Sequence, residues 1–218
     1  MTSDELYEAF REDIVDVAKP YFWSDAEVWR YMNDAYSMLV RLTQGIPDAD
    51  SEATEVQIVA NDAHGELHPS ILRIMSATRR SDGAEIKVIN ATDLSAYKRL
   101  ASLRESGRVE YMLVGSKPHT CRWVGVPVTD DVCDLTVYRL PLVPITGPGQ
   151  QLAEVEDMHH IHLLNWMKHL AYKKHDAETF NPSASKEYAA EFMSYCDKVQ
   201  AEWERYKHKT RVVAYGGL

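Results

Sequence analysis

The clearest structural signal in the sequence is Phe22-Trp23-Ser24-Asp25-Ala26-Glu27-Val28, which has the features of a helix start. The Ser24 side chain can accept a hydrogen bond from a free N–H of the first turn, and Glu27, three residues later, can accept one in return. Trp23 and Val28 occupy the two positions where apolar side chains close over that turn. The sequence therefore predicts a helix with Ser24 as its N-cap.

Apolar residues continue from this start at helical spacing. They recur every three or four residues, which places them on one face of an α-helix, and the pattern ends near Gly45. The helix is therefore expected to bury the stripe Val28, Met32, Ala35, Leu39 and Leu42.

An earlier helix is predicted at the N-terminal end. Thr2 and Glu5 have the spacing of a second capping box, and Pro20 lacks the backbone N–H that a helix interior requires. The predicted helix starts near Thr2 or Ser3, stops before Pro20 and buries the stripe Leu6, Phe10, Ile14 and Val17.

The middle of the chain, between residues 47 and 149, has a different pattern. Short runs of β-favouring residues alternate with turn-forming residues, and the spacing of the turns suits antiparallel hairpins better than parallel crossovers. A helical segment with Asp93 as its N-cap interrupts these runs and ends before Gly107. The predicted strands are 56–60, 71–77, 85–89, 109–115, 122–128 and 135–140.

Helical periodicity returns after residues 140–149, which hold three prolines and two glycines and are expected to form an extended connection. One helix should end around Asp176, and the last should start at Asn181-Pro182, an N-cap followed by proline at the first helical position. The first of these helices carries the apolar face Val155, Met158, His162, Trp166 and Leu170, and the second carries Tyr188, Phe192, Tyr195, Val199, Trp203 and Tyr206.

These elements predict an α+β fold in which helices from both ends of the chain form a bundle and an antiparallel β-rich domain is inserted between them. The bundle is assigned to residues 1–46 and 150–209, and the insertion to residues 47–149. Residues 210–218 are expected to form a flexible C-terminal tail that is unusually apolar.

The composition excludes several classes of protein. Hydrophobic residues make up 45% and charged residues 26% of the chain, as in an average globular protein. The formal net charge of −9 repels nucleic-acid phosphates, so nucleic acid is not the expected binding partner. An acidic surface is compatible, as a hypothesis, with a wall past which DNA slides without specific binding. The acidic N-terminus is unlike a signal peptide, and no apolar run reaches the roughly 18 residues of a membrane span.

The sequence offers weak candidates for catalytic or metal chemistry. Zinc and iron sites usually need three or more ligands, and His162 lies on the predicted apolar stripe, where a packing role is the simpler explanation. The cysteines form no CxxC pair, and no nucleophile elbow or phosphate loop is present. We therefore expect no enzyme, no cofactor and no metal, with a histidine-liganded metal-dependent enzyme as an alternative. The candidate ligands and nucleophiles are His159, His160, His162, His169, His175, Cys121, Cys133 and Cys196.

Two segments resemble the head-to-tail adaptor (connector) proteins of tailed bacteriophages, of the short-tailed phage type, and their relatives in gene-transfer agents. Residues 22–35 look like the early helix of that family, in which an aromatic residue, a Ser-Asp cap and a Glu precede an Asn-x-Ala. Residues 170–181, followed by Ala184, Tyr188 and Phe192, are similar to its two C-terminal helices, joined by an Asp-x-Glu-x-x-Asn turn. Residues 135–141 carry only a general likeness to the strand that leads back into these helices.

The resemblance implies a structural protein of the virion at the head–tail junction, synthesised in the host cytoplasm. Such proteins form a homo-oligomeric ring, here of twelve copies, under the portal protein. The ring extends the DNA channel and provides the attachment platform for tail or nozzle proteins, with no catalysis, cofactor or membrane involved. A tail nozzle or tail-completion subunit is the alternative within virion structure.

Two sets of residues are predicted to mediate assembly. An apolar tail can order on its partner at the moment of binding, so Val212, Val213, Tyr215 and Leu218 are candidate portal contacts, with an unstructured terminus of no function as the alternative. Amphipathic helices with wide aromatic faces can pack within a subunit or between subunits. The residues expected at such helix or subunit contacts are Trp23, Val28, Met32, Leu39, Tyr188, Phe192 and Trp203.

Overall fold

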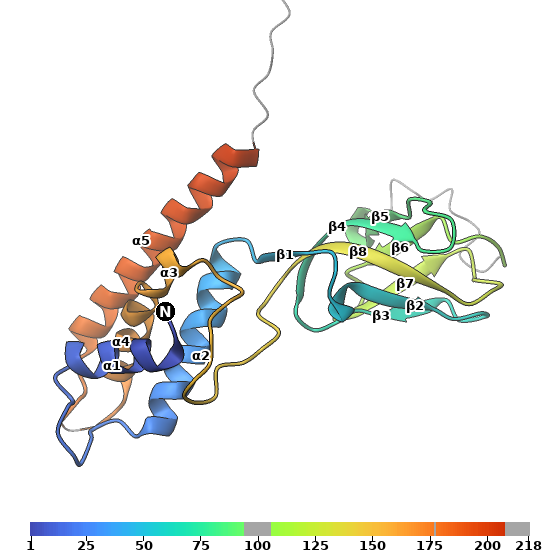
Figure 1. Ribbon diagram of the computed structural model, residues 1–218. Coiled ribbons are helices and arrows are strands. Elements are labelled where there is room, and N and C mark those ends of the chain that lie inside the picture. The colour runs from blue at the N-terminus through green and yellow to red at the C-terminus, as the bar shows by residue number, and fades with distance from the viewer. Residues whose placement is uncertain (94–105, 177, 208–218) are drawn as a thin grey trace, which may run out of the picture. The chain divides into compact units, whose positions relative to one another are not determined.

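The structure is a computed structural model, and it describes residues 1–93, 106–176 and 178–207 (Figure 1). These residues divide into a helical unit, Met1–Gln44 with the chain from Val143, and a β-rich unit, Gly45–Leu142. The expected α+β fold with helices and antiparallel strands is confirmed. The helix predicted after Asp93 and the C-terminal tail lie outside the described residues.

The described part of the helical unit contains five α-helices, of which the last is the longest (Figure 1). Helix α4 contacts α1, α2 and α5, so segments from both ends of the sequence surround it. The five helices are α1 (Ser3–Asp13), α2 (Asp25–Leu42), α3 (Asp157–His160), α4 (Leu163–Lys173) and α5 (Pro182–Lys207).

The predicted start of α2 is confirmed. The Glu27 backbone N–H donates to Ser24 Oγ at 3.4 Å, and the Ser24 backbone N–H donates to Glu27 Oε2 at 2.9 Å, which completes the capping box. The box gives the Ser24 N–H an acceptor and adds a side-chain acceptor for the Glu27 N–H, which also lies 3.0 Å from the Ser24 carbonyl oxygen. The predicted stripe lies in the core, with Val28, Met32, Ala35 and Leu39 all buried and Leu42 half-buried.

The predicted extent of α1 is wrong at its C-terminal end. The capping box of Thr2 and Glu5 is present, but the helix ends at Asp13 instead of continuing to the prolyl turn. Asp16 explains the difference, because its carboxylate is buried and accepts hydrogen bonds from backbone N–H groups that follow Pro20. Burying Asp16 turns the chain, and Val17, predicted to be buried, is 61% exposed.

The helix predicted between Val155 and Asp176 is interrupted. Short α3 ends at His160, α4 begins at Leu163, and α4 ends at Lys173 instead of near Asp176. His160 is buried, and its Nε2 lies 3.0 Å from the Val155 carbonyl oxygen, so the chain bends to place this imidazole inside. Met158, predicted on the apolar face, is 63% exposed as a result.

The start of α5 is confirmed by its hydrogen bonds. The Ala184 backbone N–H donates to Asn181 Oδ1 at 3.1 Å, and Pro182 occupies the first helical position. The core of the helical unit draws on both ends of the chain, and its buried residues include Leu6, Phe10, Trp23, Met32, Tyr36, Leu39, Leu163, Met167, Phe192 and Cys196.

The β-rich unit contains two four-stranded sheets in the described residues. In the first sheet, β8 is central and pairs antiparallel with three other strands. The first sheet comprises β1 (Ile46–Asp48), β2 (Glu55–Ile58), β4 (Ile71–Arg79) and β8 (Asp131–Arg139), and the second comprises, in spatial order, β3 (His64–Glu66), β7 (Thr120–Val124), β6 (Tyr111–Val114) and β5 (Lys87–Asn90).

Antiparallel pairing holds for every named strand pair except β5 and β6, which are parallel. Twenty residues, 91–110, connect these two strands, and a connection of this length can return the chain to the same direction, whereas a short turn cannot. The expectation of antiparallel pairing is therefore wrong for β5 and β6. A second hydrophobic core fills the unit, with Trp123, Met112, Leu135, Val137 and Ile86 among its buried residues.

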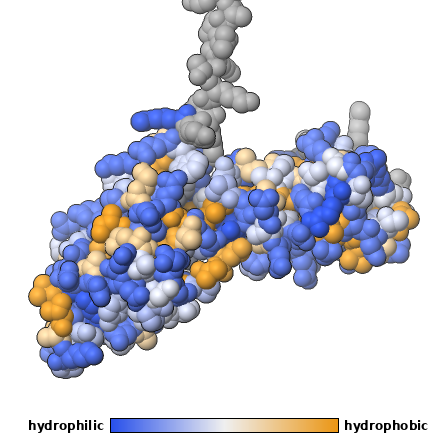
Figure 2. All heavy atoms as spheres, in the orientation of Figure 1, coloured by the Kyte–Doolittle hydropathy of each residue, from blue (hydrophilic) through white to orange (hydrophobic). Residues whose placement is uncertain are grey.

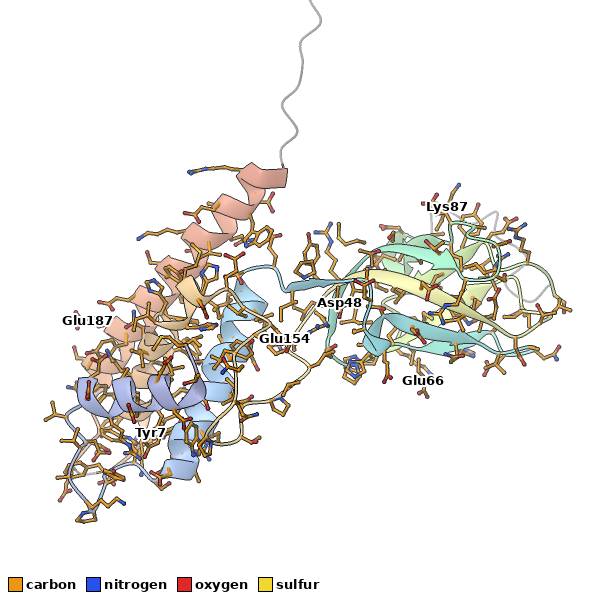
Figure 3. All side chains as sticks on the ribbon, in the orientation of Figure 1. Tyr7, Asp48, Glu66, Lys87, Glu154 and Glu187 are labelled. Carbon is orange, nitrogen blue, oxygen red and sulfur yellow. The ribbon has the colours of Figure 1, made fainter. Side chains whose placement is uncertain are left out.

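A buried ion pair joins β1 to β8 in this unit. Arg139 Nε donates to Asp48 Oδ2, and the two side chains are only 9% and 8% exposed; Figure 3 labels Asp48 on β1. Burial would raise the pKa of Asp48, but the hydrogen bonds from Arg139 and Ser51 outweigh it and hold that pKa far below its usual value. The carboxylate is thus charged and fully partnered in the folded protein.

Candidate assembly surface

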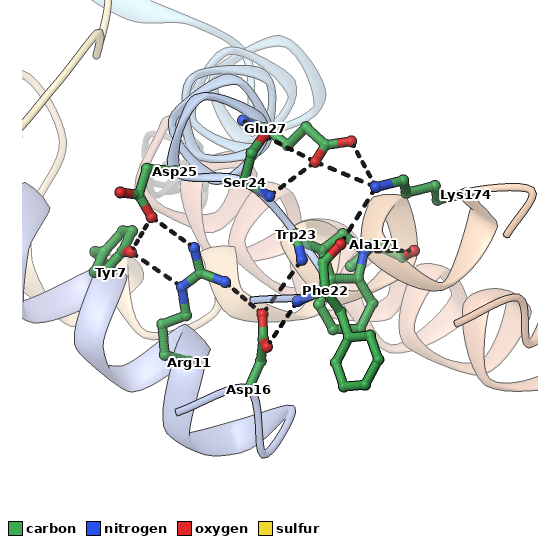
Figure 4. A network of polar contacts seen from close by, with 10 residues as sticks. All are labelled: Tyr7, Arg11, Asp16, Phe22, Trp23, Ser24, Asp25, Glu27, Ala171 and Lys174. Carbon is green, nitrogen blue, oxygen red and sulfur yellow. Dashed lines mark hydrogen bonds and ion pairs between the residues drawn. The ribbon is translucent and has the colours of Figure 1, made fainter. Parts of the chain in front are cut away.

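The loop between α1 and α2, residues 14–24, is held by a buried ionic network (Figure 4). Arg11 is 4% exposed and Asp16 is 2% exposed, and their side chains form an ion pair. Arg11 also reaches Asp25 Oδ1 at 2.8 Å and donates from Nε to the Tyr7 hydroxyl oxygen at 3.1 Å. The hydrogen bond from Tyr7 is the main reason why the pKa of Asp25 is lowered.

Asp16 also fixes the backbone on the far side of the loop. Its carboxylate accepts from the Phe22 N–H at 3.0 Å and from the Trp23 N–H at 3.3 Å. A charged acceptor with a buried cationic partner and two backbone donors has little freedom to move. The loop conformation is therefore determined by its own side chains.

The same loop is attached to the C-terminal end of α4. Trp23 Nε1 donates to the Ala171 carbonyl oxygen at 3.1 Å, and Lys174 Nζ donates to the Phe22 carbonyl oxygen at 3.3 Å (Figure 4). Lys174 also forms an ion pair with Glu27 Oε1 at 3.0 Å. Burial would raise the pKa of Glu27, but the contacts with Lys174 and Ser24 outweigh it and lower that pKa.

This fixed loop presents apolar side chains to solvent. Val15 is 80% exposed, Val17 is 61% exposed and Phe22 is 52% exposed. Val15 has a φ of +57°, a backbone conformation that costs a β-branched residue roughly 1 kcal/mol or more. We call residues 15–22 the apolar loop. In Figure 2, hydrophobic areas interrupt the otherwise largely hydrophilic surface of the helical unit.

A groove of about 480 Å³ lies between α3 and the C-terminal half of α5. Met158 is 63% exposed at this groove, and Val199 is buried beneath it. Its described lining includes two exposed glutamates and neither lysine nor arginine. We call this feature the acidic groove, and its lining residues are Glu156, Met158, His159, Val199, Glu202 and Trp203.

The histidines considered as metal ligands have other partners. His159 Nδ1 lies 2.7 Å from the Tyr195 hydroxyl oxygen, and His162 stacks on the Tyr195 ring with centroids 3.5 Å apart. His169 Nδ1 lies 2.9 Å from the Ser185 carbonyl oxygen, and His175 stacks on Phe180. Among the residues that the structure describes, no three histidine, cysteine, aspartate or glutamate side chains are grouped so that they could hold a metal ion.

The residues predicted at helix or subunit contacts all lie in the helical unit. Tyr188 is half-buried and stacks on Tyr172 with ring centroids 5.9 Å apart, and Trp203 is half-buried at the acidic groove. The candidate portal contacts Val212, Val213, Tyr215 and Leu218 lie outside the described residues. The other five predicted contact residues, Trp23, Val28, Met32, Leu39 and Phe192, are buried in the core of the subunit.

Sequence reasoning missed the apolar loop and the Arg11–Asp16 pair that holds it. Val17 belongs to the predicted apolar stripe of α1, so the pattern indicates burial where the structure shows exposure, and Val15 lies outside that stripe. The available signal was Asp16 itself, a carboxylate between two valines, five residues after an arginine.

Within the described part of the chain, no helix combines the length and apolarity that a membrane span needs.

Comparison with known proteins identifies the family. No match was found among curated proteins. A family model described as SU10 adaptor protein matches residues 1–213, which is nearly the whole chain. The resemblance to phage head–tail adaptors seen in the two helical segments is thereby confirmed. The chain belongs to the SU10 adaptor protein family.

Proposed function

We propose that this protein is the head-to-tail adaptor that forms a ring under the portal protein of a tailed phage. In this role the ring extends the DNA channel and gives the tail its attachment platform. The observation that carries the proposal is the family match over residues 1–213, since adaptors are structural components of the virion. The ring of twelve copies follows from the same family resemblance.

The physical properties of the chain support this role. A ring subunit must keep its own fold while it offers separate surfaces to its neighbours. The helical unit has a complete core, and it exposes apolar side chains on the network-held loop and beside the acidic groove. The net charge of −9 suits the wall of a channel through which DNA must slide without adhering.

The portal contact is assigned to the C-terminal tail, with Val212, Val213, Tyr215 and Leu218 as its apolar residues. Spaced apolar side chains on a chain terminus can order when they bind a preformed partner surface. Tail or nozzle proteins are expected to attach to the other side of the ring. This division of contacts makes the two attachment steps separable by experiment.

Electron microscopy of the purified protein, alone and after addition of the portal protein, tests the proposal. A ring of defined stoichiometry on the portal is expected, and removal of the residues after Thr210 should weaken portal attachment. The matched control ends the chain after Gly216, so it keeps Val212, Val213 and Tyr215 and should bind more strongly than the shorter chain. A protein that remains monomeric with the portal, or binds only tail components, would contradict the adaptor role.

A further inference from the structure

Val15 combines an exposed apolar side chain with an unfavourable backbone conformation. Its side chain is 80% exposed, and its φ of +57° is one that glycine or asparagine adopts at lower cost than valine. The fold alone does not require valine at this position, because the side chain contributes almost no burial. An apolar side chain kept in an unfavourable backbone conformation points to a contact made outside the subunit.

The apolar loop also has a simple charge pattern. Asp16 is buried and paired with Arg11, so Lys19 is the exposed charged side chain of residues 15–22. The loop therefore offers an apolar surface with one positive charge, already held in shape by the Asp16 network. A preformed loop loses little conformational entropy when it binds.

The acidic groove has the complementary character. Met158, Val199 and Trp203 supply apolar surface, while Glu156 and Glu202 supply negative charge. A ligand suited to this groove would combine small apolar side chains with a lysine or arginine, since opposite charges at a contact favour the correct partner and orientation. The apolar loop has these properties.

The two surfaces lie at opposite ends of α4. The loop is bonded to the C-terminal end through the Ala171 carbonyl oxygen and Lys174, whereas the groove includes Met158 and His159, which precede the helix. The 11 residues of α4 separate them by roughly 16 Å at 1.5 Å per residue. A loop fixed at one end of the helix does not reach the groove at the other end of the same subunit.

We propose that the apolar loop of one copy binds in the acidic groove of the next copy. Because the two surfaces differ, each subunit uses its loop on one side and its groove on the other, and repetition of the contact gives a closed ring when the rotation between neighbours permits. The inference rests on the proposed function and gives its ring a specific contact. Lys19 faces Glu156 or Glu202 of the neighbouring copy in this arrangement.

Disulfide crosslinking between two differently labelled copies tests the contact directly. One copy carries Val17→Cys and the other carries Met158→Cys, and mild oxidation should give a mixed dimer. The three native thiols interfere little, because all are buried and burial raises the pKa of each to about 12. Val128→Cys is the matched control, since it is an equally exposed valine of the β-rich unit and should not crosslink to Met158→Cys.

The same experiment examines another occupant of the groove. The C-terminal tail also combines a basic residue, Arg211, with apolar residues, so Tyr215→Cys should be oxidised against Met158→Cys in parallel. Crosslinking of Val17→Cys in preference to Tyr215→Cys supports the inference. The reverse preference, or no crosslink to Val17→Cys in rings formed on the portal, would overturn it.

Val15→Asn separates folding from assembly. Asparagine accepts the backbone conformation more readily, so thermal unfolding of the subunit should be unchanged or shifted upward, while the ring contact should weaken on the order of tenfold. Assembly is measured by analytical ultracentrifugation and by electron microscopy on the portal. Val59→Asn, an exposed valine of the β-rich unit, serves as the control and should leave assembly unchanged.

Reversing the charges on both sides of the proposed contact should restore part of the assembly that either single reversal loses. Lys19→Glu and Glu202→Lys should each weaken assembly, and the double variant should recover part of the loss, because every contact then pairs the exchanged charges. If the wild-type protein forms rings and all these variants form them equally well, the loop-to-groove contact is wrong and the adaptor function stands. If the wild-type protein forms no ring even with the portal, the proposed function itself fails.

Discussion

Asp16 connects three segments of the helical unit. It pairs with Arg11 of α1, accepts the N–H groups of Phe22 and Trp23, and thereby fixes the start of α2. Both members of the ion pair are almost fully buried, so water cannot replace a lost partner. At this scale a single carboxylate determines whether Val15, Val17 and Phe22 have a fixed arrangement.

We predict that Asp16→Asn destabilises the helical unit by about 3 kcal/mol, since removing one member of a buried ion pair leaves the other uncompensated. Breaking a buried ion pair costs about 3–5 kcal/mol, and the loss should lie at the lower end of that range because Arg11 keeps Asp25 as a partner. Urea unfolding followed by helical circular dichroism measures the change. Glu12→Gln, an exposed neighbouring carboxylate, is the control and should change stability little.

Replacing both Arg11 and Asp16 tests how much the backbone hydrogen bonds to Asp16 contribute to stability. Arg11→Met with Asp16→Leu removes the buried charges together, which often restores stability. Here it should not, because the N–H groups of Phe22 and Trp23 would lose their acceptor. The same urea unfolding measures the result, and a double variant as stable as the wild-type protein would contradict the prediction that losing these backbone bonds outweighs the removal of the buried charges.

Among the elements, strand β8 organises the first sheet, and its link to β1 depends on the pair of Arg139 and Asp48. The pKa of Asp48 is lower in the folded protein than in the unfolded chain, where a carboxyl titrates near 4. The stabilisation that the ionised Asp48 gives to the folded protein is therefore complete above about pH 4, and it is lost progressively as the pH falls below that value. Acid should weaken the β1–β8 link.

We predict that Asp48→Asn lowers the stability of the β-rich unit by roughly 3 kcal/mol at pH 7, and that its difference from the wild-type protein narrows below about pH 4. Hydrogen exchange of the β8 amides, corrected for intrinsic rates, measures the effect at both pH values. Asp50→Asn changes an exposed carboxylate two residues away and is the control. A difference that stays constant with pH would contradict the assignment of Asp48.

Helix starts could be predicted from the sequence because their signals are local. The capping boxes at Thr2 and Ser24 and the Asn181 cap each depend on residues within a few positions. The errors occur where distant residues decide. Val17 is exposed because Asp16 is buried, and β5 pairs in parallel with a strand twenty residues further along.

The candidate assembly surface was harder to predict for the same reason. The groove forms because α3 bends away at His160 and meets the second half of α5, a tertiary event that periodicity does not report. The helical spacing predicts Trp203 as a contact residue, whereas nothing in the sequence around Val15 distinguishes an exposed valine from a buried one. Exposure of an apolar residue depends on what the rest of the fold leaves uncovered.

On the scale of the whole molecule, the residues that the structure describes form two hydrophobic cores with no residue in common. The helical core contains Phe192 and is assembled from both ends of the sequence, while the β-rich core contains Leu135 and is assembled from the middle. An inserted unit of this kind has its own cooperative interactions. Loss of buried volume in one core should therefore act first on the unit to which that core belongs.

We predict that Phe192→Ala and Leu135→Ala have separate effects, each costing roughly 3 kcal/mol because both side chains are almost fully buried. In hydrogen exchange of the full chain, Phe192→Ala should accelerate amides of α2, α4 and α5 and leave those of β8 unchanged. Leu135→Ala should do the opposite, so each variant is the control for the other. Equal acceleration of both sets by either variant would mean that the two cores unfold as one, and a change in the β-rich unit would then also disturb the apolar loop and the ring contact assigned to it.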